Sequence, residues 1–511
     1  MISRCRNGGR TVLAAGALAL LAAAAPTASD DLPLTAAAER QDWRAVHALL
    51  AAGADVNAAQ ADGATALHWA AHWDALAAVE TLLQAGAEVD GANDHGVTPL
   101  FLAAENGNAP AAERLLAAGA DASATLPADG ETVLMRAAHS GSAAIVRMLL
   151  DRGADPHARA LRSGQTALMW AIAENHAAAA RELIAHGADV RGRSHGHYTP
   201  LLFAARQGNV AIAAMLLDAG VPVDRDGPGP APLVVAIERG RVPFARFLLE
   251  RGAAPDIVMR NGSTPLAAAF AIGGRQLGYD PDAVVHEPPD KLDLVRDLLA
   301  SGADPNRRRA APEAGARVYS PDGQASGFDR GPTDPDNFGV ARSWIGASPF
   351  WVAAHKADVT LLELLLDAGA DPTVTTEDGT TPLMVAAGLG HAGDRYEKFW
   401  SAAAAREAVE FLVERGADVN AANEAGFTAL HGAAFVGAEA AADYLVARGA
   451  DLNAQDFAGR TPYRIAQGHK GGGMSFVSRP GTVALLARLG ADTALGPHFN
   501  DTEREEGLQV R

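Results

Sequence analysis

Residues 98–121, TPLFLAAENGNAPAAERLLAAGAD, contain two short motifs that recur along the chain. The first is Thr98-Pro99-Leu100, and the second, Gly119-Ala120-Asp121, begins 21 residues later. From Thr65 to Thr264, close variants of the first motif return at steps of 32 to 34 residues. A fixed period of this length indicates a repeat architecture. The 511 residues are therefore interpreted as a series of similar units rather than as three or four independent domains.

The first motif always places an apolar or aromatic residue two positions after its first residue. Its copies begin at Thr65, Thr98, Thr132, Thr166, Thr199, Ala231, Thr264, Ser348, Thr381, Thr428 and Thr461. An incomplete copy ends at Leu34, which lies 33 residues before Leu67. About twelve units are expected, and the period is broken between Thr264 and Ser348.

Each motif has a physical role in forming helices. A Thr hydroxyl can cap a helix N-terminus, and Pro at the next position suits the first turn because its missing N–H would be unpaired there anyway. Val146, Leu149 and Leu150 have the spacing of a buried helix face. The Gly that follows, such as Gly153, can adopt the left-handed conformation that ends a helix. Each unit is therefore expected to contain two short helices.

These residues resemble the ankyrin repeat family. Thr65-Ala66-Leu67-His68 and Thr428-Ala429-Leu430-His431 are nearest to the family's Thr-Pro-Leu-His opening, and the resemblance covers roughly residues 32–495. It implies an all-α, elongated and curved solenoid in which each repeat has a β-turn finger and two antiparallel helices. Because one unit cannot bury its apolar face alone, stacking of neighbours supplies the core.

Three positions depart from the family pattern. Gly220-Val221-Pro222 and Gly252-Ala253-Ala254 lack the Asp of the second motif, and Ala231 lacks the capping hydroxyl of the first. We expect these units to be locally weaker or bent.

The period divides the chain into five segments. These are a signal peptide at 1–28, a first block of repeats at 32–273, an interrupted repeat with two insertions at 274–345, a second block of repeats at 346–495 and a polar tail at 496–511. The two large insertions fall around 274–290 and 307–340, and smaller ones fall around 394–400 and 470–478. Long loops are often functional, with disorder as the alternative.

The N-terminus has the pattern of an export signal. Arg4, Arg6 and Arg10 precede an apolar run from Thr11 to Ala25, and cleavage is expected between Ala24 and Ala28. Cleavage would also remove Cys5, which is the only cysteine, so disulfides and thiolate sites are excluded from the mature chain. We expect a periplasmic or secreted protein, and the Ala-rich composition favours a bacterial source. No transmembrane segment is expected, because the apolar run is too short to span a bilayer.

The balance of charge argues against nucleic acid as a partner. The sequence has 61 acidic and 43 basic residues and a net charge of -18, and such a surface repels phosphate backbones. The dense basic run Arg307-Arg308-Arg309 is interpreted as a solvated loop cluster.

Candidate catalytic and metal sites are weak. His195-Gly196-His197-Tyr198 lacks further residues to complete a metal-ligand set. The aspartates of the large insertions do not match a calcium-loop spacing. The chain also lacks a nucleophile elbow, a phosphate loop and a dinucleotide-binding glycine pattern. The sequence therefore predicts neither an enzyme nor a cofactor.

The remaining interpretation is surface recognition of an unidentified protein through the concave face and the 307–340 loop. The resemblance implies that partners contact finger tips and the inner positions after the Ala-Ala pair. On this chain the predicted positions are His72, Trp73, Asp94, His95, Glu105, Asn106, His139, Glu174, Asn175, Arg206, Gln207, Glu238, Arg239, His355, Lys356 and Phe435. Arg162, Ser163 and His195 are further tip positions.

Three alternatives remain open at this point. Each of these side chains can instead pack against a neighbouring helix or be simply solvated. The protein can be a secreted factor that binds a host protein. It can also be a ligand- or metal-binding protein whose inserted loops form a pocket. The sequence leaves the oligomeric state undetermined.

Overall fold

The computed structural model describes residues 33–224, 230–258, 264–270, 291–310, 345–390, 401–468 and 478–497. The predicted signal peptide, the insertions at 274–290 and 394–400, and most of those at 307–340 and 470–478 lie outside these residues. Nearly all of the polar tail does as well.

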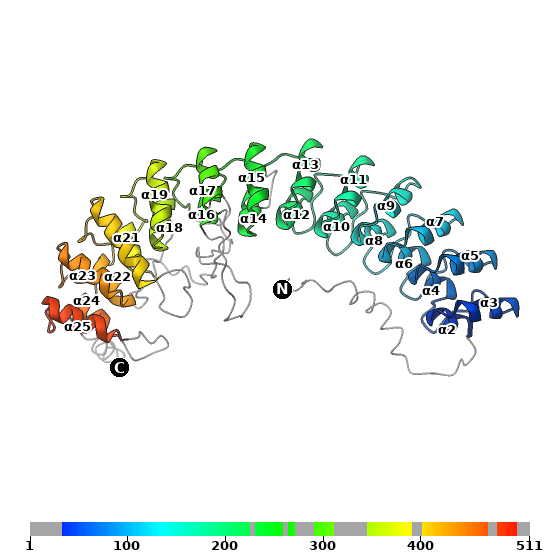
Figure 1. The fold of residues 1–511 in the computed structure, drawn as a ribbon, viewed down its shortest axis with the longest axis horizontal. Coiled ribbons are helices and arrows are strands. Elements are labelled where there is room, and N and C mark those ends of the chain that lie inside the picture. The colour runs from blue at the N-terminus through cyan, green and yellow to red at the C-terminus, as the bar shows by residue number, and fades with distance from the viewer. Residues whose placement is uncertain are drawn as a thin grey trace, which may run out of the picture. The chain divides into compact units, whose positions relative to one another are not determined.

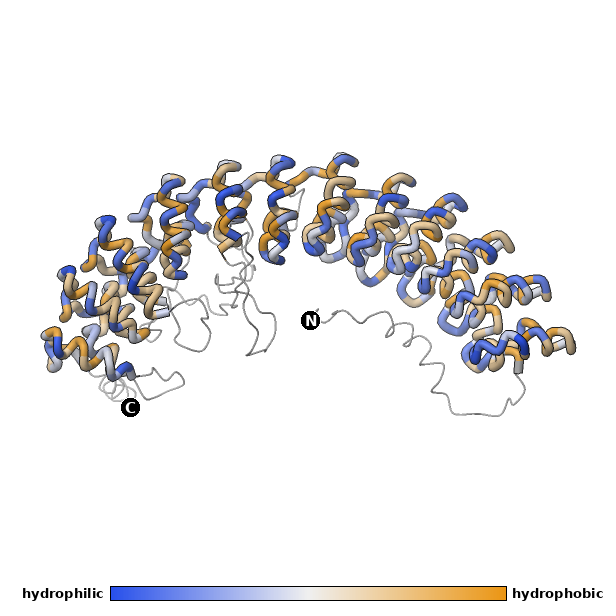
Figure 2. The backbone as a smooth tube through the Cα atoms, in the orientation of Figure 1, coloured by the Kyte–Doolittle hydropathy of each residue, from blue (hydrophilic) through white to orange (hydrophobic). Residues whose placement is uncertain are grey.

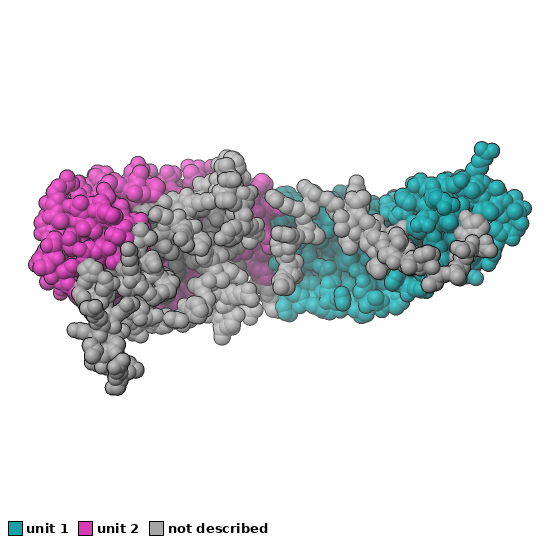
Figure 3. All heavy atoms as spheres, turned by 90° about the horizontal axis from the view of Figure 1, so that it is seen from below, with its two compact units in different colours: residues 1–222 teal, residues 223–511 magenta. Residues whose placement is uncertain are grey.

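The chain divides into two compact units, residues 1–222 and 223–511, here called unit 1 and unit 2 (Figure 3). The division directly follows Gly220-Val221-Pro222, one of the units in which the second motif lacks its Asp. In other repeats this carboxylate accepts a hydrogen bond from the backbone two residues later, as Asp121 does from Ser123 N at 2.8 Å. Pro222 occupies the position of this Asp and has no side-chain oxygen to accept the bond.

Unit 1 contains six helix pairs in its described residues (Figure 1). They are α2 (Pro33–Glu39) and α3 (Trp43–Ala51), α4 (Ala66–His72) and α5 (Leu76–Gln84), α6 (Pro99–Asn106) and α7 (Ala109–Ala117), α8 (Val133–Ser140) and α9 (Ala143–Leu150), α10 (Ala167–Ala173) and α11 (Ala177–Ala185), and α12 (Pro200–Gln207) and α13 (Val210–Asp218). Even-numbered helices are called first helices and odd-numbered ones second helices.

Unit 2 also contains six pairs in its described residues. They are α14 (Pro232–Glu238) and α15 (Val242–Glu250), α16 (Pro265–Ala269) and α17 (Lys291–Ala300), α18 (Pro349–His355) and α19 (Val359–Asp367), α20 (Pro382–Ala386) and α21 (Ala402–Glu414), α22 (Ala429–Val436) and α23 (Glu439–Ala447), and α24 (Pro462–Gln467) and α25 (Pro480–Leu489). The all-α class and the expected number of repeats are therefore confirmed. In the described residues, β pairing is limited to the isolated bridges Ala59–Thr65 and Thr125–Thr132.

The first motif performs the predicted capping. The Thr98 hydroxyl accepts a hydrogen bond from Phe101 N at 3.3 Å, and Thr132 accepts one from Met135 N at 3.1 Å. Ala231 makes no side-chain cap, as the sequence predicts. Gly119 follows α7 with φ +99°, and a Cβ there would meet nothing within 4 Å. Glycine is therefore favoured at this position by backbone conformation rather than by space.

The core of each unit lies between and within two layers of helices, because first helices pack on first helices and second helices on second helices. In α6, the Leu100, Ala103 and Ala104 side chains are fully buried, and Leu115 of α7 is buried with them. Figure 2 shows hydrophobic residues along the helices and hydrophilic ones concentrated at the turns. Each buried leucine contributes about 1.5–3 kcal/mol, while the alanines let neighbouring helices approach closely.

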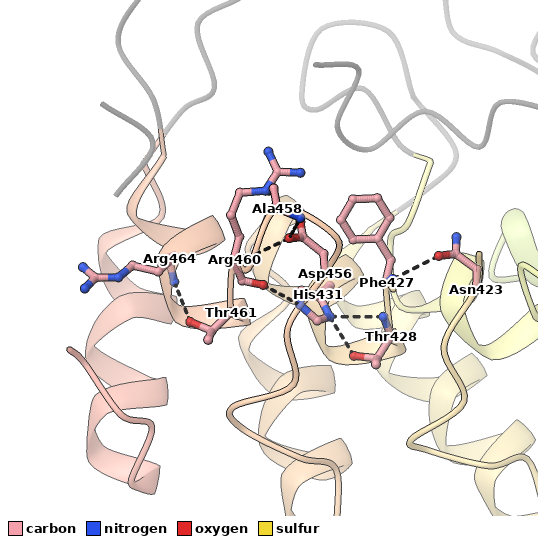
Figure 4. Close-up of polar contacts among 9 residues, drawn as sticks. All are labelled: Asn423, Phe427, Thr428, His431, Asp456, Ala458, Arg460, Thr461 and Arg464. Atoms are coloured by element: carbon pink, nitrogen blue, oxygen red, sulfur yellow. Dashed lines mark hydrogen bonds and ion pairs between the residues drawn. The ribbon is translucent and has the colours of Figure 1, made fainter. Parts of the chain in front are cut away.

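Buried histidines fix the start of two first helices. The His431 Nδ1 atom accepts hydrogen bonds from Thr428 N at 3.1 Å and from the Thr428 hydroxyl at 2.9 Å (Figure 4). Its Nε2–H donates to the Arg460 carbonyl of the next repeat at 3.1 Å. Burial lowers the pKa of His431 to about 4, so the imidazole is neutral at pH 7. His68 makes the same contacts with Thr65 and the Val97 carbonyl, and burial lowers its pKa as well.

We expect stability to fall as His431 becomes protonated. The His431 imidazole titrates near pH 6.5 in the unfolded chain and near pH 4 in the native protein. Its contribution to the free energy of unfolding is therefore complete above pH 6.5 and is lost as the pH falls towards 4. Its size is on the order of 3 kcal/mol. His431→Gln should unfold at a lower temperature at pH 7 but lose less stability between pH 6.5 and 4. Thermal unfolding followed by circular dichroism measures both, and equal losses in the two proteins would contradict a buried neutral imidazole.

Candidate protein-interaction surface

A finger is the turn that precedes each first helix, and consecutive fingers are joined through their backbones. In unit 1, Asp94 N donates to Asp62 O at 2.9 Å, and His195 N donates to Ser163 O at 2.8 Å. In unit 2, Glu424 N donates to Asp378 O at 2.9 Å. The fingers and the C-terminal ends of the first helices together are called the first-helix face of each unit.

Most of the predicted binding residues reach solvent on this face. Trp73, Asp94, His95, Asn106, Glu174, Asn175, Arg206, Glu238 and Arg239 are exposed, and His72, Glu105, His139, Gln207, Lys356 and Phe435 are partly exposed. His355 was expected to be exposed and is instead buried, with 9% exposure. Its ring is stacked on Trp351 with centroids 5.8 Å apart, so packing within α18 determines its position.

Several predicted residues also join neighbouring repeats. Asn106 Nδ2 donates to the His72 carbonyl at 3.2 Å, and Gln207 donates to the Ala173 carbonyl. Asn209 donates to the Asn175 side chain at 2.6 Å. The last carbonyls of a helix lack intrahelical partners. Here Asn106 and Gln207, which belong to the next repeat, donate hydrogen bonds to these carbonyls. The packing alternative therefore applies in part to Asn106, Asn175 and Gln207.

An aromatic cluster lies at the end of α4. The Trp69 and Trp73 rings are stacked at 6.5 Å, and His72 meets Trp73 edge to face at 4.6 Å. Trp69 is buried, whereas Trp73 is 41% exposed. Burial lowers the pKa of His72, so this ring is neutral at pH 7. The cluster therefore presents an uncharged aromatic surface to solvent.

A second cluster, which the sequence analysis missed, lies across α6, α8 and α10. The Arg136 guanidinium lies between the rings of Phe101 and Trp170, 5.6 and 5.7 Å from their centroids. It forms ion pairs with Glu131 and, at 3.7 Å, with Glu105. Arg136 stabilises three consecutive repeats by cation–π and ionic contacts.

Burial shapes the titration of groups beside Arg136. It raises the pKa of Glu131 even though Arg136 acts in the opposite direction. His139 lies edge-on to Trp170 at 5.2 Å and 4.0 Å from Glu174. Burial is the main reason that the pKa of His139 is lowered. These shifts accompany packing between repeats, so they do not by themselves indicate acid–base catalysis.

Two finger residues missed by the sequence analysis are the most exposed large hydrophobic side chains in the described parts of the chain. Leu161 is 66% exposed and Phe457 is 83% exposed. A local signal was available, because Phe457 stands where other fingers have a polar residue such as Asp94 or Glu424.

The basic run at 307–309 is not simply a solvated cluster. Arg308 Nε donates to the Gly346 carbonyl at 3.0 Å, and its Nη2 donates to the Thr375 carbonyl at 2.8 Å. Burial lowers the pKa of Arg309. Arg307 is exposed, as expected. Arg308 therefore joins backbone segments from successive fingers, which sequence spacing did not reveal because the partners are 38 and 67 residues away.

The described residues contain no group of three or more His, Cys, Asp or Glu side chains that could hold a metal ion. Within the same parts of the chain, the helices are too short or too polar to cross a membrane.

Comparison with known proteins identifies the class of this protein. A family model described as ankyrin repeats in three copies matches residues 14–93, 90–160, 134–227 and 350–456. These matches cover more than half of the sequence, and the chain belongs to the ankyrin repeat family. Ankyrin repeats generally mediate protein–protein interaction.

One solved structure is the crystal structure of the human ASB11 ankyrin repeat domain. It is similar to this chain with 29% identity, 44% of this chain and 100% of that chain covered, and a TM-score of 0.40. No curated protein matches the sequence.

We expect Arg136→Met to destabilise unit 1 by about 1–3 kcal/mol, because it leaves partly buried acids without their cation. Arg147→Met makes the same chemical change at an exposed position on α9 and should change stability by less than about 0.5 kcal/mol. Urea unfolding of the two variants measures the difference. Equal effects would show that Arg136 does not link the repeats energetically.

Proposed function

We propose that this protein is a non-enzymatic interaction scaffold that binds another protein through its first-helix faces. The main support for this proposal is the location of the exposed large hydrophobic side chains. Among the described residues these are Trp73, Leu161 and Phe457. One lies at the end of a first helix and two lie on fingers, whereas exposed large hydrophobics are missing from the described second helices. Exposed aromatic residues are favoured anchors in protein interfaces.

The family supports the same proposal. An ankyrin repeat solenoid is typically a scaffold rather than an enzyme. Among the described residues, His431 has a pKa lowered to about 4, and it is fully buried and hydrogen-bonded between two repeats. Surface complementarity without chemistry is therefore the mechanism that these residues support, with no cofactor involved.

The proposed location is the periplasm or the cell exterior of a bacterium. This part of the proposal depends on Arg4, Arg6, Arg10 and the apolar run up to Ala25. The proposed contribution of the 307–340 loop likewise depends on sequence beyond the described residues. Binding to a host protein is the same mechanism in another setting. The ligand- and metal-binding alternatives depend on the inserted loops, and the described residues give them no specific support.

Affinity capture from envelope and culture fractions, followed by quantitative mass spectrometry, tests the proposal. Trp73→Glu should reduce recovery of a specific partner at least roughly fivefold, because the substitution places a charge where the partner would bury an aromatic side chain. Ala85→Glu is the matched control: it adds the same charge at the C-cap of α5 in the same repeat, at an exposed position. Circular dichroism verifies that both variants are folded.

Equal recovery with both variants would argue against the first-helix face of unit 1. A separate deletion of residues 311–340 tests the loop. It should begin after Ala310, because removal of Arg308 would also remove its bonds to the Gly346 and Thr375 carbonyls. If neither the full chain nor the deletion variant captures a specific partner, the scaffold proposal is contradicted.

A further inference from the structure

Three fingers of unit 2 place their tips in a row: residues 376–379, 423–426 and 456–459. The tip residues are Glu377, Glu424 and Phe457. Glu424 N donates to the carbonyl of Asp378, and Phe457 N donates to the carbonyl of Ala425 at 3.1 Å. The tips are therefore held side by side by backbone bonds. The row of these three residues is called the tip row.

Phe457 is an exposed hydrophobic side chain on a fixed turn. Asp456 Oδ1 accepts hydrogen bonds from Ala458 N at 2.9 Å and Arg460 N at 2.8 Å, while Asp456 Oδ2 pairs with Arg460 Nε at 2.7 Å (Figure 4). The Asp456 and Arg460 side chains are only 1% and 8% exposed. A partner that covers Phe457 would lose little conformational entropy in the turn, and such preorganisation increases affinity.

The negative charge beside Phe457 favours a partner with basic side chains. Glu377 and Glu424 are both exposed, and Asp378 adds a third acid to the same fingers. Among the described residues nearby, Arg460 is paired with Asp456. Arg308 donates to two backbone carbonyls and keeps its positive charge, which offsets part of the charge of the three acids. Basic side chains would therefore be attracted to the tip row, and phosphate-rich surfaces would be repelled.

The spacing of the tips indicates the conformation of that partner. Packed helices lie about 8–10 Å apart, and because one finger precedes each first helix, we infer a similar interval between tips. A polyproline II segment has three residues per turn and rises about 3.1 Å per residue, so side chains three residues apart lie on one side about 9 Å apart. A fully extended strand instead alternates its side chains between two faces.

We propose that the tip row binds an extended, polyproline II-like segment of a partner protein. Two basic residues three positions apart contact Glu377 and Glu424, and an apolar residue three positions beyond them covers Phe457. The inference rests on the proposed scaffold function and specifies the chemistry of its partner.

Fluorescence anisotropy with labelled synthetic peptides and the full chain tests this inference. The probe is Arg-Pro-Pro-Arg-Pro-Pro-Leu with short neutral flanks, made in both sequence directions. It should bind, and binding should weaken as salt screens the charges. A peptide of the same composition with adjacent arginines should bind roughly tenfold more weakly, and a peptide with Glu in place of Arg should not bind.

Variants of the protein locate the site. Phe457→Ala and Glu424→Lys should each weaken binding roughly tenfold. Glu407→Lys introduces the same charge change at an exposed position on α21 and should leave binding unchanged. An equal loss with Glu407→Lys, equal binding of the rearranged peptide, or no binding of either probe direction would overturn the proposal. Self-association of the full chain that depends on Phe457, measured by sedimentation, would overturn it in favour of a second copy.

The outcomes separate this inference from the general function. If the peptides do not bind while Trp73→Glu still removes a captured partner, the tip-row inference is wrong and the scaffold function stands. Peptide binding can depend on Phe457 while capture finds no partner that is lost with Trp73→Glu. In that case the tip row binds its segment, and the proposal that the first-helix face of unit 1 binds a partner is wrong.

Discussion

A single helix pair of this protein cannot bury its own apolar surface, and the rest of the structure depends on that constraint. Ala103 and Ala104 are fully buried because another repeat packs on each side of α6. Polar groups obey the same nearest-neighbour logic. The Arg460 carbonyl receives a hydrogen bond from His431 of the preceding repeat, and the His72 carbonyl receives one from Asn106 of the following repeat. Stability in such arrays is a sum of local terms and contacts between adjacent units.

The periodic part of the fold could be predicted from sequence because its causes are local. A capping hydroxyl at Thr98, an apolar face that includes Leu100 and a left-handed glycine at position 119 each act within one repeat. Contacts between repeats were less predictable. The engagement of Arg308 and the insertion of Arg136 between two rings depend on how helices and turns are oriented after stacking.

The candidate surface shows the same distinction. The pattern after the Ala-Ala pair correctly indicated positions that reach solvent, including Trp73 and Glu174. It did not indicate that Asn106 and Gln207 also bond to carbonyls of the preceding repeat. Phe457 was missed because the predicted finger positions are polar, although an aromatic residue in a turn of Asp, Ala and Gly is visible in the sequence.

The finger turns have a consequence for how such a protein can evolve. In the finger at residues 456–459, Asp456 supplies the hydrogen bonds and Gly459 the positive φ of +71°, while the tip side chain contributes little to either. Asn423 and Gly426 have the same division of roles around Glu424. Natural selection can therefore exchange a tip residue, Glu for Phe or the reverse, with little cost to folding. New specificity can arise one substitution at a time on a scaffold that each intermediate sequence still forms.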